Sequence, residues 1–193
     1  FKNAANAWSG LGVGIAASSG DKQGSGNNFL PRYRTPGQAQ FFNYRSTVAA
    51  DGEHSRWSPQ AYYYRNAFGL LAEYIESKQE LLIAGATPVR ADLSNSAWQV
   101  ATSYVLTGED ASFRGVVRPD APFGVDGGWG AFEVAARYGK LDVDDGAFPL
   151  FADPGVAASD ATAFGIGLNW YLSSNLKLVL NQTRTEFTGG AAN

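Results

Sequence analysis

The side chains with the clearest chemical potential in this sequence are arginines and lysines on segments where polar and apolar residues alternate. Arg56, Arg137 and Lys177 each fall on the polar edge of such a segment. A cation beside a water-filled path attracts anions, and a guanidinium group suits phosphate because its planar fork donates two hydrogen bonds. Four more arginines lie in two long loops and become candidates if those loops fold inward: Arg32, Arg34, Arg114 and Arg118.

Acidic residues on the same edges support a competing interpretation. Glu73 and Glu133 alternate with apolar neighbours just as the cations do, so the opposite charges would pair and only solvate a water-facing surface. The formal net charge of −3 argues against a nucleic-acid partner. It does not exclude a locally basic path, because the field in such a path depends on the groups that line it.

The sequence offers little for catalysis. Its only histidine, His54, follows Asp51 and Gly52, which we expect to form a turn, and a turn histidine is usually a solvated surface residue. Cysteine is absent, which excludes disulfides, thiolate zinc sites and thiol nucleophiles. We expect no enzyme activity, no metal and no cofactor.

The composition favours an all-β protein. Glycine is abundant at 23 of 193 residues, 45% of residues are hydrophobic, and no segment sustains a helical 3.6-residue pattern. No apolar run approaches the ~20 residues of a transmembrane helix. If the chain enters a membrane, it must therefore do so as a closed antiparallel β-barrel, whose strands satisfy every backbone hydrogen bond.

The clearest pattern is a predicted hairpin from Ala161 to Phe187. Large apolar residues alternate with small or polar ones on both arms, and Ser173–Asn175 supplies a tight turn. Trp170 and Tyr171 stand beside that turn, where amphipathic rings of a membrane barrel meet the lipid headgroups. A soluble sheet with one buried face explains the hairpin alone equally well.

About eight strands are expected in all. The other strands are predicted at 8–18, 39–45, 56–63, 68–75, 97–106 and 131–138, with loops at 19–38, 77–95, 107–128 and 141–160. The opposite strand edges carry mostly Gly, Ala and Ser, which suit a wide lumen. The residues predicted to face lipid are Leu11, Val13, Ile15, Trp98, Val100, Phe132, Val134, Phe164, Ile166, Leu168, Leu178 and Leu180.

The turn lengths predict an orientation. Outer-membrane barrels have short turns on the periplasmic side, which would place Arg65–Ala67 and Ser173–Asn175 there. Counting strands then puts loops 77–95 and 141–160 outside. It also puts loops 19–38 and 107–128 on the periplasmic side, where their length is unexpected. Either strands are miscounted or these two loops fold into the lumen.

Six short motifs run through most of the chain in a consistent order. They are Arg56–Gln60 (RWSPQ), Phe68–Tyr74 (FGLLAEY), Ala97–Val100 (AWQV), Leu106–Glu109 (LTGE), Trp129–Tyr138 (WGAFEVAARY) and Gly167–Leu172 (GLNWYL). Together they resemble the phosphate-selective porins O and P. The resemblance implies a homotrimeric porin of the bacterial outer membrane, with a barrel of roughly sixteen strands. It also implies passive uptake of small anions, with phosphate and polyphosphate as candidates, but no single binding residue can be matched.

The resemblance further implies that residues 1–193 form one porin domain that is incomplete at both ends. Family members end in a strand that closes on an aromatic residue, whereas this sequence stops at Thr188–Asn193, and no export signal opens it. We expect a C-terminal-half portion that contacts outer-membrane lipid. The alternatives are a complete eight-stranded barrel that acts as an anchor and a soluble β-sandwich that binds a ligand.

Overall fold

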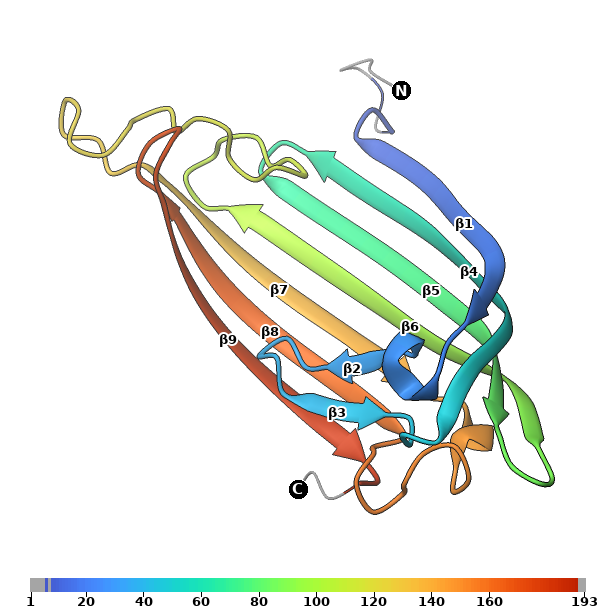
Figure 1. The fold of residues 1–193 in the computed structure, drawn as a ribbon. Helices are drawn as coiled ribbons and strands as arrows, with labels where there is room; N and C mark the ends of the chain where they lie inside the picture. The colour runs from blue at the N-terminus through green and yellow to red at the C-terminus, as the bar shows by residue number, and fades with distance from the viewer. Residues whose placement is uncertain (1–5, 7, 191–193) are drawn as a thin grey trace.

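The described part of the chain forms nine β-strands (Figure 1). The computed structural model describes residue 6 and residues 8–190; the expected ending at Thr188–Asn193 thus lies partly outside the described residues. Seven strands form one antiparallel sheet in the order β1-β4-β5-β6-β7-β8-β9, and two form a small separate sheet. The elements are β1 (Leu11–Gln23), η1 (Gly26–Phe29), β2 (Arg32–Arg34), β3 (Gln40–Asn43), β4 (Val48–Arg65), β5 (Phe68–Ile83), β6 (Val89–Val105), β7 (Ala131–Asp142), η2 (Asp145–Ala147), β8 (Asp160–Tyr171) and β9 (Lys177–Thr188).

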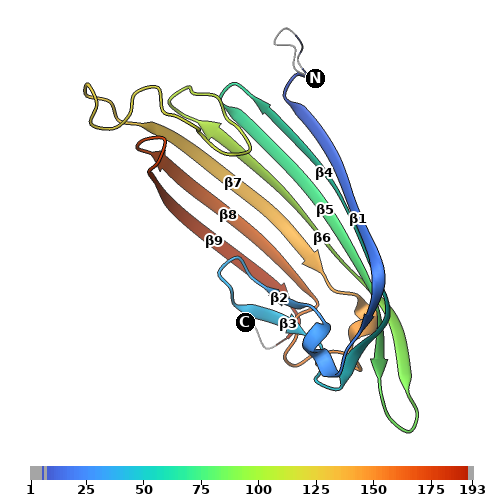
Figure 2. The same ribbon diagram turned by 45° about the horizontal axis from the view of Figure 1, so that its top comes forward.

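The large sheet is a curved wall (Figure 2). Its edge strands, β1 and β9, each pair with one neighbour among the described residues, so the wall is open rather than a closed barrel. No helix in the described part of the chain is long and apolar enough to cross a membrane. The all-β antiparallel prediction is confirmed, whereas the number of strands in a closed barrel stays a prediction.

Period-two alternation gives the wall two chemically different faces. Asn169 and Tyr171 of β8 both hydrogen-bond Glu133 of β7, which fixes these side chains on the concave face. Directly paired residues on antiparallel strands share a face, so this assignment extends through every register from β1 to β9. All the residues predicted to face lipid lie on the convex face, where Val13, Ile15 and Leu180 are more than 70% exposed.

Two rows of aromatic residues cross the convex face. On each of four successive strands the two aromatic residues stand six positions apart, which is ~20 Å along the strand. The pairs are Phe68 and Tyr74, Tyr104 and Trp98, Phe132 and Tyr138, and Trp170 and Phe164. Mostly aliphatic residues lie between the rows, as in the lipid-facing band of a membrane barrel. Between β6 and β7, the aromatic residues of each row are not directly paired but are offset by two residues. Tilted strands need this offset if each row is to stay level across the sheet.

The two ends of the wall differ. The β4–β5 turn and the 172–176 turn lie at one end, which we call the short-turn end, together with loop 106–130. At the opposite end, β5 and β6 continue past the aromatic row and are joined only by residues 84–88. The predicted loop at 77–95 is therefore wrong. Beyond the row the convex face carries charges such as the Lys78–Asp92 ion pair, and the concave face mixes Gln79 with the buried Leu81, so the alternation of the belt is lost there.

The connection between β1 and β4 lies on the concave face of the wall. Residues 24–47, here called the inner hairpin, contain η1, β2 and β3 and leave from the end opposite the short turns (Figures 1 and 2). The predicted wall strand at 39–45 is wrong, because residues 40–43 pair only with β2. When that strand is left out of the count, loop 19–38 is assigned to the end opposite the short turns. The structure places it at that end.

The second long loop, 106–130, divides into two parts. Its first part covers the concave face at the short-turn end: Ala111 donates its N–H to Asn66 O (2.6 Å), and the Phe113 ring lies 6.4 Å from that of Tyr62. Its second part turns to the convex side, where Phe123 contacts Trp170. Loop 107–128 lies at the predicted end of the wall, and only its first part folds inward.

The alternation can be tested by cysteine labelling on β8, because the chain contains no cysteine. Ala163→Cys and Gly165→Cys should react with a water-soluble maleimide in the membrane-embedded protein, whereas Phe164→Cys and Ile166→Cys should be protected by lipid. Equal labelling of both sets would show that the strand or its register is wrong.

Candidate functional site

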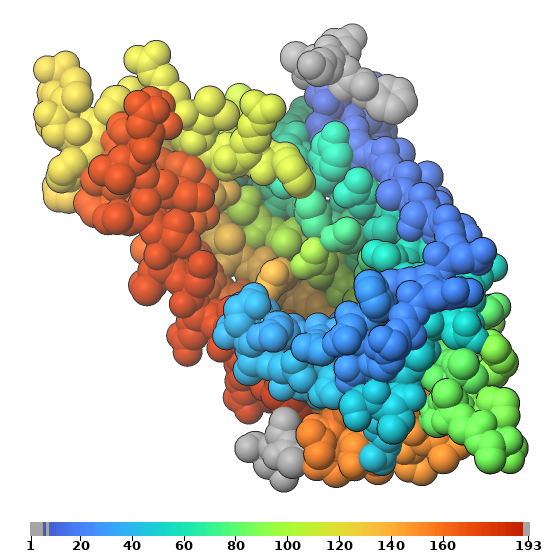
Figure 3. Space-filling view, viewed as in Figure 1, coloured from blue at the N-terminus to red at the C-terminus, as the bar shows by residue number. Residues whose placement is uncertain are grey.

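The concave face is lined by small side chains between its charged positions. Gly14, Ala101, Ala135 and Gly165 all point to this side according to the strand registers. Figure 3 shows the resulting hollow between the wall and the inner hairpin. The space is therefore bounded by strands behind and by a folded loop in front.

A buried amide attaches the inner hairpin to the wall. Asn95 of β6 donates from Nδ2 to the hydroxyl oxygens of Tyr33 (3.0 Å) and Tyr44 (3.1 Å). Its Oδ1 accepts from the Asp144 N–H (3.0 Å), so one side chain joins the wall, the inner hairpin and the β7–β8 loop. Burial raises the pKa of both Tyr33 and Tyr44, which keeps the two phenols neutral in this contact.

Apolar and ionic contacts complete the attachment. Phe42 and Tyr44 are each 1% exposed and pack edge-to-face, with ring centroids 5.0 Å apart. Phe41 contacts Phe187 of β9 across the concave face, at 5.4 Å between centroids. Arg45 forms an ion pair with Asp153 at 3.2 Å. The hairpin is thus held at a fixed position above the wall.

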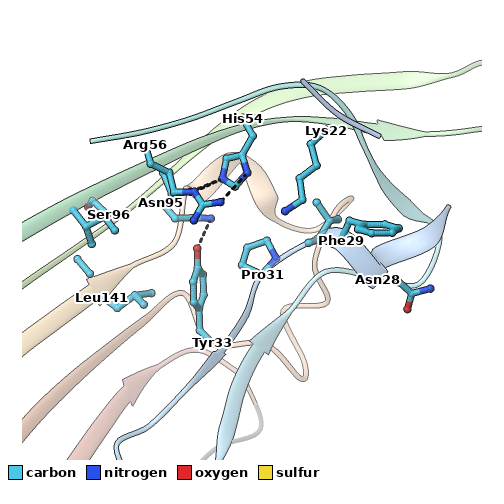
Figure 4. Close-up of a pocket in the computed structure, with 14 residues that line it drawn as sticks. Lys22, Asn28, Phe29, Pro31, Tyr33, His54, Arg56, Asn95, Ser96 and Leu141 are labelled. Carbon is cyan, nitrogen blue, oxygen red and sulfur yellow. Dashed lines mark hydrogen bonds between the residues drawn. The ribbon is translucent and has the colours of Figure 1, made fainter. Parts of the chain in front are cut away.

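The first candidate site is a cavity of about 510 Å³ beneath the root of the inner hairpin. Lys22 of β1 and His54 and Arg56 of β4 point into it toward Pro31 and Tyr33 of the inner hairpin (Figure 4). None of the residues that line this cavity is acidic. The cavity therefore combines two cationic side chains with no carboxylate to neutralise them.

His54 lies within β4 and not in the predicted turn, because β4 begins at Val48. Arg56 Nε donates to His54 Nε2 (3.1 Å), and Ser77 Oγ lies 3.0 Å from the same nitrogen. A catalytic serine–histidine pair needs a group such as a carboxylate to orient Nδ1, but here Arg56 Nη2 lies 3.4 Å from that atom. The ring positions Arg56 and does not form a serine–histidine–carboxylate triad.

A second cavity, of about 240 Å³, lies under the tip of the inner hairpin. It brings Arg34 of the hairpin and Arg137 of β7 to one space, together with Glu73 and Gln99. Gln99 Nε2 donates to the Glu73 carboxylate at 2.9 Å. Arg137 forms no ion pair with any other described residue, although Glu73 lines the same cavity.

Lys177 occupies the short-turn end of the same face. Its Nζ lies 5.3 Å from the centroid of the Tyr171 ring, a cation–π arrangement. Glu133 is 4% exposed and accepts hydrogen bonds from Asn169 (2.9 Å) and Tyr171 (2.7 Å) instead of pairing with Lys177. Both acidic candidates are thus bonded to neutral donors.

The remaining candidates are less centrally placed. Arg32 is exposed on β2, and Arg114 and Arg118 are exposed in loop 106–130, so the structure does not bring these three to the two cavities. Lys22 was missed as a site residue. It continues the even-numbered edge of β1 that starts at Gly12, and extending the predicted strand beyond residue 18 would have found it.

With the exception of Arg65 at the β4–β5 turn, which lies on the convex face and is unpaired, the paired and unpaired cations of the described wall are separated by face. The ion pairs Lys78–Asp92, Lys140–Asp142 and Arg184–Glu186 lie on the convex face. Lys22, Arg56, Arg137 and Lys177 lie on the concave face, and none forms an ion pair among the described residues. The concave face thus keeps its positive charge available to a solute.

An antiparallel wall with an aliphatic belt between aromatic rows outside and a polar face inside defines a porin-type membrane protein. Comparison with family models agrees: the model of the phosphate-selective porins O and P matches residues 2–186. The chain therefore belongs to the phosphate-selective porin O and P family, a family of outer-membrane porins. This membership implies a channel rather than an enzyme. A search of curated proteins found no match.

The attachment at Asn95 can be tested by removing the amide. Asn95→Ala leaves two buried phenols and one backbone N–H without their partner, which should destabilise the docked hairpin by about 1–3 kcal/mol. Trypsin should then cut faster after Arg32 and Arg34 in the folded protein. Ser96→Ala is the matched control, since the neighbouring side chain points to the opposite face. Equal cleavage of both variants would show that Asn95 does not hold the hairpin.

Proposed function

We propose that this chain forms part of an outer-membrane channel for the passive uptake of small anions, with phosphate and polyphosphate as candidate solutes. The observation that carries the proposal is the separation of cations by face: apart from Arg65 at the β4–β5 turn, the convex cations of the wall are paired, and the concave ones are not. Unpaired guanidinium and ammonium groups beside an aqueous path raise the local concentration of anions.

The path we propose runs along the concave face. Lys177 stands at the short-turn end, Arg137 and Arg34 under the hairpin tip, and Lys22 and Arg56 at its root. The hairpin narrows the path, which brings a passing solute close to these cations. The guanidinium groups at the tip would each offer two hydrogen bonds to a phosphate group.

Closure of the wall is part of the proposal. The free edges of β1 and β9 would pair with further strands in a barrel of roughly sixteen strands, which leaves a water-filled channel. The short-turn end would face the periplasm, because short turns mark that side in outer-membrane barrels. The small side chains of the concave face favour this wide lumen over a filled eight-stranded barrel.

The charge of the path can be tested in planar bilayers. At low salt the reversal potential should favour anions, and Arg137→Glu should reduce the anion preference severalfold. The effect should weaken as salt rises, because exposed charges are screened over ~8 Å at physiological ionic strength. The matched control is Arg184→Glu, the same change on the convex face, which should leave selectivity unaltered.

The outcomes separate the parts of this proposal. A wild-type preference for cations would refute anion uptake while leaving family membership intact. If the wild type prefers anions and Arg137→Glu does not change that preference, selectivity is set elsewhere, with the cavity of Lys22 and Arg56 as the next candidate.

Assembly can be tested by gel migration. We propose a homotrimer, because porin subunits bury part of their barrel walls against each other. Unheated protein in mild detergent should migrate at about three times the subunit mass and shift to the monomer position after boiling. A monomer in detergent before heating would contradict the trimer.

A further inference from the structure

The second part of loop 106–130 forms a small hairpin on the convex side of the wall. We call residues 117–130 the outer hairpin, which extends beyond the 172–176 turn at the short-turn end (Figures 1 and 3). Backbone bonds close it: Gly128 donates to Val125 O and Gly130 to Ala121 O, both at 2.8 Å. The Phe123 N–H donates to Leu172 O, also at 2.8 Å, and ties the hairpin to the wall.

The outer hairpin exposes an unusual number of large apolar side chains. Val117 is 68% exposed, Phe123 47%, Val125 56% and Trp129 68%. Gly124 and Gly127 have φ values of 77° and 78°, which allow the tight turn that leaves Val125 exposed at its tip. An exposed apolar cluster of this kind in a stable structure indicates a contact with another apolar phase or partner.

The cluster continues the aromatic row of the wall. The Phe123 ring meets Trp170 edge-to-face, with centroids 5.3 Å apart and an interplanar angle of 88°. Trp170 Nε1 donates to Trp129 O at 2.6 Å, and the Trp170 ring stacks on Phe132 of β7. Trp170 and Phe132 belong to the row at the short-turn end, so the hairpin is rooted at the level where the wall meets lipid headgroups.

We propose that the outer hairpin is a membrane-interface anchor, with its apolar side chains inserted at the boundary between lipid headgroups and acyl chains. Trp129 and Phe123 would sit among the headgroups, as interfacial aromatic residues do, and Val125 at the tip would lie in the same interfacial layer. Arg118, Asp120 and Asp126 would stay on its hydrated side. The hairpin would thereby fix the height of the wall in the leaflet at the short-turn end.

Continuity with the wall is the reason to choose lipid as the partner. The hairpin and the convex belt share the Trp170 contact, so any phase that covers Ile166 and Leu168 extends to the hairpin. The proposal rests on the membrane position of the wall and is independent of ion selectivity.

The test uses spin labels on single cysteines in the porin reconstituted into phosphatidylcholine–phosphatidylglycerol vesicles. Collisions with oxygen report lipid exposure, and collisions with a water-soluble nickel chelate report aqueous exposure. Val125→Cys should show higher oxygen and lower nickel accessibility than the aqueous control. Ile166→Cys is the lipid-facing control, and Ala86→Cys, in the turn at the opposite end, is the aqueous control.

The possible results are distinct. A Val125→Cys label that matches Ala86→Cys would overturn the anchor while leaving the membrane wall intact. A label shielded from both reagents would overturn it in favour of a protein contact. If Ile166→Cys itself behaves as aqueous, the membrane position of the wall fails, and the proposed channel fails with it. Val117→Cys provides a second position on the hairpin and should agree with Val125→Cys.

Discussion

The structure depends on the requirement that every backbone N–H and C=O within a bilayer has a hydrogen-bond partner in the protein. An antiparallel ladder across seven strands meets this requirement within the lipid-facing belt, except at the outer edges of β1 and β9, which pair with no other described strand. The ladder forces alternate residues to opposite faces, so one face must be apolar for the lipid. The other face is then free to carry glycine, serine and unpaired arginine. The site on the concave face is thus a consequence of how the wall satisfies its backbone.

The inner hairpin is stabilised differently from the wall strands, because it is not part of the large sheet. Its two strands are only three and four residues long and could not stand alone, so they rely on aromatic packing and on the single amide of Asn95. Small side chains on the concave face provide the space that the hairpin fills. The wall and the hairpin together place Arg34 opposite Arg137, although these residues lie on unconnected sheets.

Sequence reasoning found the strands that cross the lipid belt. The alternation at 97–106, 131–138 and 161–187 predicted the strands and their faces correctly, because lipid demands an apolar residue at every second position. It failed outside the belt. Residues 77–95 extend two strands beyond the belt, where the convex face is charged and the concave face buries Leu81 and Leu93, and residues 39–45 pair only within the inner hairpin. The cavity with Lys22 and His54 could not be foreseen, since it depends on where the hairpin folds back.

The two aromatic rows also locate the charges along the membrane normal. Lys177 lies beside the row at the short-turn end, and Arg137 lies next to Tyr138 in the other row; on the concave face Glu133 and Asn169 lie between these two levels. Cations are more numerous at the hairpin end, so the path is electrically asymmetric. If the wall closes into the proposed channel, this asymmetry should make the current rectify, so that anions pass more readily in one direction than in the other.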